Sequence, residues 1–181
     1  MAVATEQRLP TGTWRLDKVH SSAAFAVKHM VVATFRGRFE DFDATLEVAE
    51  DGEAELTGTV RADTIVVKDE NLGAHLKSPD FFDTERYPEI RFESTSVRRD
   101  GDQVVADGEL TIKDHTHPVK ARGAFAGPYE DIAGQTKVGL TLETTVDRTQ
   151  FGLNWNAPLP KGGVALADEV ALIVELELVE G

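Results

Sequence analysis

The segment DENLGAHLKSPDFFDTERYPEIRF, residues 69–92, departs from the strand-like alternation found elsewhere in the chain. Asp69 is a favourable N-cap residue, and a short helix with one largely apolar face is predicted to follow it. Pro79 disfavours helical backbone at the residue before it, so the helix is expected to end at Ser78. The predicted apolar face of this helix consists of Leu72, His75 and Leu76.

The second half of the segment holds two adjacent aromatic residues, Phe81 and Phe82, in a predicted turn. Two neighbouring rings that can each bury about 150 Å² or more cannot both face solvent cheaply. Pro88 then favours an extended entry into a strand over residues 89–97. We interpret residues 69–92 as a plug, a short helix and an aromatic turn laid over the mouth or flank of a sheet. The alternative is an ordinary crossover between two strands.

The rest of the chain alternates between apolar and polar residues, which is the pattern of half-buried β-strands. Near Glu40–Asp41 the apolar phase moves from odd to even positions, and a strand changes phase only by inserting a residue, so a β-bulge is predicted there. The alternating segments are residues 14–19, 23–27, 35–39, 42–48, 54–62, 89–97, 104–112, 119–125, 138–146 and 169–179. Because some of them continue one another, as 35–39 and 42–48 do across the bulge, roughly eight strands are expected. Turns are predicted at 51–52, 100–102 and 113–118, and a loop from 127 to 135.

Strands with one apolar face must bury that face, either in a sandwich or by closing into a barrel. The strands are long, a bulge bends one of them, and Gly58, Gly108 and Gly123 recur on inward faces, where they leave room. These features favour an all-β fold, a closed antiparallel eight-stranded barrel with one short helix. Residues 1–12 are expected to be a flexible N-terminal arm, and residues 13–181 a single barrel domain.

The charge balance and composition exclude several classes of protein. The chain has 32 Asp and Glu against 19 Lys and Arg, a net charge of −13, which argues against a nucleic-acid partner. It has no cysteine, so it has neither disulfides nor a thiolate metal site. Neither a secretory signal nor an apolar run of about 18 residues is present, so we expect a cytoplasmic location and no stable membrane insertion.

The chain resembles the YceI-like, or polyisoprenoid-binding, family over nearly its whole length. The motifs that carry the resemblance are WRLDKVHSSAAF (14–25), HM (29–30), FRGRF (35–39), HLKSPDFFDTERYP (75–88), FES (92–94), GELTIK (108–113), PV (118–119), DRTQFG (147–152), GGV (162–164) and DEV (168–170). One departure is Asp-His-Thr-His at 114–117, where the family more usually has a glycine and a basic residue. The resemblance implies a lipocalin-like barrel whose elongated apolar cavity holds a long isoprenoid chain, without implying an enzyme, and it makes a homodimer plausible.

Inward-facing apolar residues agree with a hollow barrel, although periodicity alone allows a filled core equally well. We therefore predict a protein that binds a long-chain polyisoprenoid of the quinone or prenyl phosphate type, for transport, storage or shielding. No metal, cofactor or catalytic residue is predicted. The predicted ligand-binding residues are Phe25, Val27, His29, Met30, Phe35, Phe39, Phe81, Phe82, Tyr87, Phe92, Leu110, Phe125, Leu140, Trp155 and Leu172.

A second class of function is an enzyme acting on an isoprenoid-type lipid. His115 and His117 are two residues apart, so on an extended segment they project the same way and could bind a metal together with His29 or His20. His29 is in phase with inward residues, where a neutral imidazole could instead hydrogen-bond a lipid headgroup. Three arginines are candidates for a phosphate or a quinone oxygen at the barrel mouth: Arg36, Arg38 and Arg148.

Overall fold

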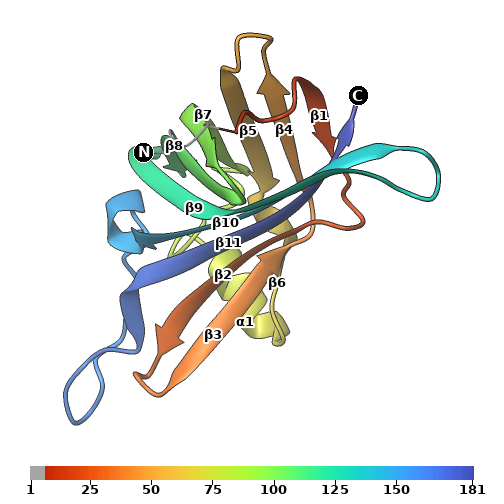
Figure 1. The fold of residues 1–181 in the computed structure, drawn as a ribbon. Coiled ribbons are helices and arrows are strands. Elements are labelled where there is room, and N and C mark those ends of the chain that lie inside the picture. Colours follow the sequence, from red (N-terminus) through yellow and green to blue (C-terminus); the bar gives the residue numbers. More distant parts are fainter. Residues whose placement is uncertain (1–6) are drawn as a thin grey trace, which may run out of the picture.

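The alternating segments form one antiparallel sheet that closes on itself (Figure 1). The computed structural model describes residues 7–181. The strands are β1 (Gly12–Leu16), β2 (Ser22–His29), β3 (Ala33–Phe39), β4 (Phe42–Val48), β5 (Ala54–Arg61), β6 (Ile65–Val66), β7 (Glu89–Asp100), β8 (Gln103–Ile112), β9 (His115–Glu130), β10 (Thr136–Asp147) and β11 (Leu166–Glu180). The helices are α1 (Glu70–Lys77) and two 3₁₀ turns, η1 (Ala62–Thr64) and η2 (Arg148–Phe151).

The barrel has eight strand positions because three of them are occupied by two consecutive elements. β1 and β2 pair with successive parts of the same edge of β11, β3 continues into β4, and β5 continues through η1 into β6. The ring closes where β1 pairs with β4 on one side and with β11 on the other, in the register Trp14↔Glu180 and Leu16↔Leu178. The predicted closed antiparallel eight-stranded barrel with one short helix is confirmed.

One end of the barrel is filled by side chains. Trp14, Leu46 and Leu178 are at most 1% exposed and lie in a cluster with inward residues of the neighbouring strands. Residues 1–6 of the expected N-terminal arm lie outside the described residues. Beyond them Leu9 is buried in this cluster, and the Trp14 indole Nε1 donates to the Pro10 carbonyl oxygen at 3.0 Å.

The opposite end of the barrel is covered by residues 69–92. The Asp69 side chain accepts a hydrogen bond from the Leu72 amide at 2.8 Å, and the helix ends as predicted at Ser78, whose backbone is extended. The chain then turns back, with the amides of Phe82 and Thr84 donating to the carbonyls of Leu76 and Lys77. Helix α1 lies behind β3 and next to β6 in the view of Figure 1. The plug interpretation therefore holds, because the segment packs on the barrel interior rather than only connecting two strands.

The observed breaks between strands match the predicted ones at some positions and differ from them at others. The phase change occurs across Glu40–Asp41, as predicted, but the structure has a two-residue break there, between the end of β3 at Phe39 and the start of β4 at Phe42, in place of the predicted bulge. The turn predicted at 113–118 is wrong: it is a tight turn over 113–114, because Lys113 adopts a left-handed φ of 58° and Ile112 pairs directly with His115. The loop predicted at 127–135 is shortened to 131–135, since β9 continues to Glu130.

The three inward glycines play different parts in the packing of the barrel. A Cβ on Gly123 would overlap the Thr141 carbonyl oxygen, and one on Gly108 would lie 2.7 Å from the Phe92 ring, so both glycines allow close approach rather than leaving space. Gly58 is different. Its nearest neighbour to an added Cβ is the Asp43 carbonyl oxygen at 3.7 Å, so the room predicted at Gly58 exists.

An ion network on the outside ties the two sides of the closure together. The Lys137 ammonium lies 2.7 Å from a Glu177 oxygen, 3.2 Å from Asp17 and 3.3 Å from Asp131, joining β10, β11, the β1–β2 corner and the β9–β10 loop. His20 Nδ1 lies 2.9 Å from the same Asp17 oxygen as Lys137. Hydrogen bonds from His20 and Lys137 lower the pKa of Asp17 to about 2, and the bond to Asp17 raises the pKa of His20 above 6.5.

We predict that Asp17→Asn lowers the free energy of unfolding by about 1 kcal/mol at neutral pH. The pKa of Asp17 is depressed in the folded state, so the carboxylate's contribution is present above its unfolded pKa of about 4 and is lost as the pH falls toward 2. The raised pKa of His20 adds a contribution that is present below about 6.5 and is lost as the pH rises through the folded pKa.

The difference between wild type and Asp17→Asn should therefore be largest between about pH 4 and 6.5 and should vanish near pH 2. Urea unfolding across this range measures the difference, and an NMR titration should show the pKa of His20 returning toward 6.5 in the variant. A difference that is independent of pH, with an unchanged His20 titration, would contradict the role given to Asp17.

Candidate functional site

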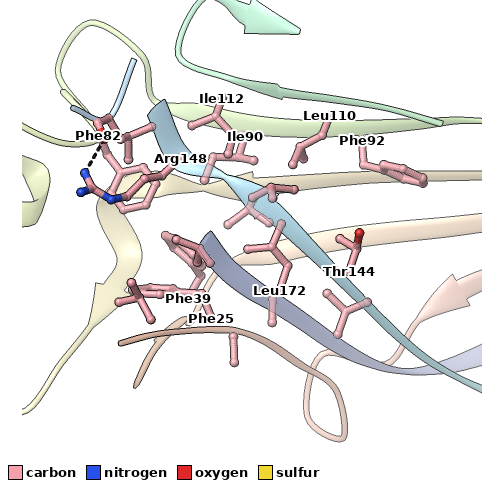
Figure 2. A pocket seen from close by; sticks show the side chains of 18 of the residues that line it. Phe25, Phe39, Phe82, Ile90, Phe92, Leu110, Ile112, Thr144, Arg148 and Leu172 are labelled. Atoms are coloured by element: carbon pink, nitrogen blue, oxygen red, sulfur yellow. Dashed lines mark hydrogen bonds between the residues drawn. The ribbon is translucent and has the colours of Figure 1, made fainter. Parts of the chain in front are cut away.

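A cavity of about 590 Å³ occupies the barrel between the filled end and the plug. Carbon atoms make up nearly all of its wall. Figure 2 shows the side chains of neighbouring strands pointing into it, with Phe25, Phe39, Phe82 and Arg148 toward one end and Phe92 and Thr144 further along. Its volume falls in the range of about 300–1,000 Å³ that is usual for small-molecule sites.

Four aromatic rings form one wall at the plug end. The centroid of Phe25 lies 6.1 Å from that of Phe35 and 5.9 Å from that of Phe39, and Phe39 meets Phe82 edge to face at 5.7 Å. The first three rings come from β2 and β3, and Phe82 comes from the plug. Gly37 pairs with Phe25 and lets its ring lie against β3, because a Cβ at this position would lie 2.5 Å from the ring.

The plug contributes a second aromatic group and the face of α1. Leu72, His75 and Leu76, the predicted apolar face of the helix, all line the cavity. The His75 ring lies 5.0 Å from both the Phe81 and the Trp155 ring centroids, edge to face in each case. Its Nε2 lies 2.9 Å from an Asp80 oxygen, so the imidazole is oriented between an acid and two rings.

Arg148 is a charged residue at the cavity wall, and it is only 6% exposed. Its Nη1 donates to the carbonyl oxygens of Leu153 at 2.6 Å and Trp155 at 2.9 Å, and its Nε donates to Ala167 at 2.8 Å. Asp168 lies 3.5 Å from Nη2. Burial lowers the pKa of the guanidinium. These bonds fix the segment between η2 and β11 against the barrel end.

The predicted site residues are split between the cavity and its surroundings. Those that line the cavity are Phe25, Val27, His29, Phe35, Phe39, Phe81, Phe82, Phe92, Leu110, Trp155 and Leu172. Phe125 and Leu140 face inward but lie in the cluster that fills the other end. The Arg86 guanidinium carbon lies 5.3 Å from the centroid of the Tyr87 ring, and Met30 is at an exposed turn. None of these four residues lines the cavity.

Sequence reasoning also missed residues of the wall. Ile90, Ile112, Thr144, Val146 and Val170 line the cavity and lie two positions from, or in phase with, residues that were selected. The alternation that identified Leu110 and Phe92 applied equally to them. Leu153 and Leu166 lie at the ends of a loop, where no periodicity marked them.

The histidines considered as metal ligands, His115 and His117, lie beside polar groups of neighbouring residues and outside the cavity. His117 Nε2 lies 2.9 Å from the Gln150 carbonyl oxygen, His115 Nδ1 lies 2.8 Å from Asp114, and neither imidazole lines the cavity. Among residues 7–181, the group of three possible ligands whose atoms all lie within 4.8 Å of one another is Asp17, His20 and Glu177, which excludes both histidines.

The described part of the chain contains no helix long and apolar enough to cross a membrane.

Two of the arginines considered for a headgroup lie outside the barrel. Arg38 is paired with Glu40 at 3.1 Å on the outer surface, and Arg36 is exposed. Neither of these two arginines lines the cavity.

Comparisons with known proteins match this architecture. A family model described as YceI-like domain matches residues 14–178. A UPF0312 protein of Staphylococcus aureus strain N315 is 34% identical over 160 residues, which cover 85% of this chain and 90% of that protein.

Solved structures share the fold. BcnA of Burkholderia cenocepacia superposes with a TM-score of 0.76 at 21% identity, over 90% of this chain and 98% of that one. Another structure is described as a polyisoprenoid binding domain from Saccharophagus degradans implicated in plant cell wall breakdown. It superposes with a TM-score of 0.65 at 11% identity, over 93% of this chain and 98% of that one. The family match confirms the resemblance seen in the motifs: the chain belongs to the YceI-like domain family.

Proposed function

We propose that the protein binds a long-chain polyisoprenoid lipid in the barrel cavity, for transport, storage or shielding. The observation that carries the proposal is the cavity itself, about 590 Å³ of space walled by aliphatic and aromatic side chains inside a closed barrel. The Saccharophagus degradans neighbour, described as a polyisoprenoid binding domain, supports the same class of ligand. A cytoplasmic location and a homodimer stay predictions.

An apolar chain in this cavity needs no elaborate polar site to bind. Burial stabilises a hydrocarbon by about 0.8 kcal/mol per CH₂, so one five-carbon prenyl unit contributes roughly 3–4 kcal/mol before the cost of ordering the chain. Methyl branches of a prenyl chain suit a wall of mixed rings and aliphatic groups, such as Phe25, Phe92, Leu110 and Leu172. Chain burial therefore supplies most of the affinity.

The polar groups of the wall favour a neutral headgroup inside the cavity. The Arg148 guanidinium donates to three carbonyl oxygens and lies beside Asp168, so it is already partnered and poorly placed to bind a phosphate. His29 is exposed at the rim, where its imidazole can hydrogen-bond a quinone oxygen. A prenyl phosphate would place its charged group outside, beside His29 and Lys28. We therefore favour the quinone type.

Gly58→Leu tests the cavity without opening the core. The Phe92 ring, whose residue pairs with Gly58, lies over Gly108 and leaves the Gly58 position uncovered, so a leucine there extends into the cavity. We expect binding of a fluorescent prenyl probe to weaken about tenfold or more, since the leucine takes the space of roughly one prenyl unit. Unfolding free energy should stay equal or rise by about 0.5–1 kcal/mol, because glycine is unfavourable within a strand.

Gly139→Leu is the matched control for this substitution. Gly139 is also inside a strand, β10, but it alternates outward, and an added Cβ would meet Ala126 Cβ at 3.7 Å. This variant should bind the probe like wild type. Equal probe affinity in Gly58→Leu and Gly139→Leu, with both variants folded, would show that the probe does not occupy the cavity.

Phe82 of the plug carries the second prediction, because it lines the cavity and packs edge to face on Phe39 of β3. If the plug acts as a lid, folded Phe82→Ala should release the bound probe about tenfold faster than wild type. Stopped-flow displacement of the probe, corrected for the folded fraction, measures this rate.

Leu178→Ala serves as the control, since Leu178 is fully buried and does not line the cavity. It should lose about 2–5 kcal/mol of stability and keep the wild-type release rate in its folded fraction. Identical release from wild type and Phe82→Ala would leave the plug as scaffolding alone.

A further inference from the structure

Two neighbouring loops present apolar side chains to solvent beside the first residues of β11. In the turn between β2 and β3, Val31 is 76% and Val32 86% exposed, and Met30 is 39% exposed. In the loop before β11, Val164 is 47% exposed and pairs with Pro158, also exposed. The loops are joined by the Met30 amide, which donates to the Ala165 carbonyl at 2.8 Å. We refer to these five residues as the apolar tip.

The backbone of the β2–β3 turn is unusual for its sequence. Met30 and Val31 have φ values of 53° and 65°, and the Val32 amide donates to the His29 carbonyl, so the turn has the type I′ form. That form favours Asn-Gly at its central positions, and a β-branched residue in the left-handed region is a genuine outlier. The chain thus keeps large apolar side chains where small polar residues would be more stable.

The two chain segments that carry the tip differ in charge from the rest of the chain. Residues 18–39 and 148–167 contain no Asp or Glu, in a chain that has 32 of them. Lys28 is exposed on β2 and Lys161 is exposed in the loop before β11. The nearest carboxylates along the chain, Asp168 and Glu169, begin the body of β11, and Asp168 lies beside Arg148. The tip is therefore an apolar surface on an acidic molecule, and the two segments that carry it contribute basic but no acidic side chains.

The apolar tip is continuous with the cavity. His29 and Ala33, which flank the β2–β3 turn, line the cavity and are exposed, and Ala165 and Leu166 line it directly after Val164. In Figure 1 the β2–β3 turn and the loop before β11 project together from the same end of the barrel. A surface touching these loops would therefore meet the cavity rim.

We propose that the apolar tip docks reversibly on the surface of an anionic lipid bilayer. The valines and Met30 enter the headgroup–acyl boundary, Lys28 and Lys161 face the anionic headgroups, and the acidic body of the protein is held away from them. This orientation places the cavity rim against the bilayer, so a lipid chain can pass between them without crossing water. Docking goes beyond lipid binding in the cavity, since it rests on the tip residues and their charge.

The test is flotation of the full chain with vesicles of phosphatidylcholine, with and without phosphatidylglycerol. Wild type should float with the anionic vesicles and less with the neutral ones, and salt should weaken the association. Val31→Asn with Val32→Asn should lower the bound-to-free ratio by about tenfold. Asparagine tolerates left-handed backbone, so the double variant keeps the turn and remains folded. Lys28→Gln with Lys161→Gln should remove most of the preference for anionic vesicles.

Ile132→Asn is the matched control, because Ile132 is fully exposed but lies in the β9–β10 loop at the opposite end of the barrel. It should float like wild type. Wild type that stays unbound on anionic vesicles, or equal losses in the Ile132 and valine variants, would overturn docking. A valine variant that converts a dimer to a monomer, with vesicle binding unchanged, would also overturn it and assign the tip to self-association.

Docking and cavity binding can fail separately. The valine variant should bind a prenyl probe in solution like wild type, since its valines do not line the cavity. Loss of vesicle flotation with intact probe binding supports the docking proposal. Vesicle flotation without probe binding by wild type would remove the proposed ligand and leave the docking surface.

Discussion

The pairing of β1 with β11 is the constraint on which the rest of the structure depends. It closes the sheet, so every inward side chain must either pack against the opposite wall or face an enclosed space. Near the closure, Trp14, Leu178 and their neighbours fill the interior to close packing. Toward the other end the inward side chains, Gly58 and Thr144 among them, leave part of the interior unfilled, and this space is the cavity.

The open end requires a cover, and two segments supply it in different ways. The plug covers the interior with Phe81 and Phe82, while the segment after η2 is fixed by hydrogen bonds from Arg148 to its carbonyls. A buried guanidinium with partners on most sides stabilises an irregular backbone that no strand ladder could satisfy. At this end the exposed cavity residues His29 and Ala33 adjoin the apolar tip.

Much of the fold could be predicted from the sequence, because a strand's period of two identifies the inward face with few ambiguities. The same period does not tell at which level along the barrel axis an inward side chain lies, in the filled end or at the cavity. Phe125 and Leu140 share faces with cavity residues yet lie in the filled end, whereas Ile112 and Val146 lie at the cavity and were not selected. The tight turn at Lys113 and the Met30–Val31 turn could not be predicted either, since both place non-glycine residues in left-handed backbone.

The most direct test of the central claim is what the cavity holds in the cell. The protein should be purified without detergent, extracted with organic solvent, and the extract analysed by mass spectrometry against the same amount of a protein without a cavity. We predict an isoprenoid lipid, of the quinone type, at up to about one molecule per chain. An extract containing no prenyl lipid, or only the unbranched fatty acids also found with the control protein, would contradict it.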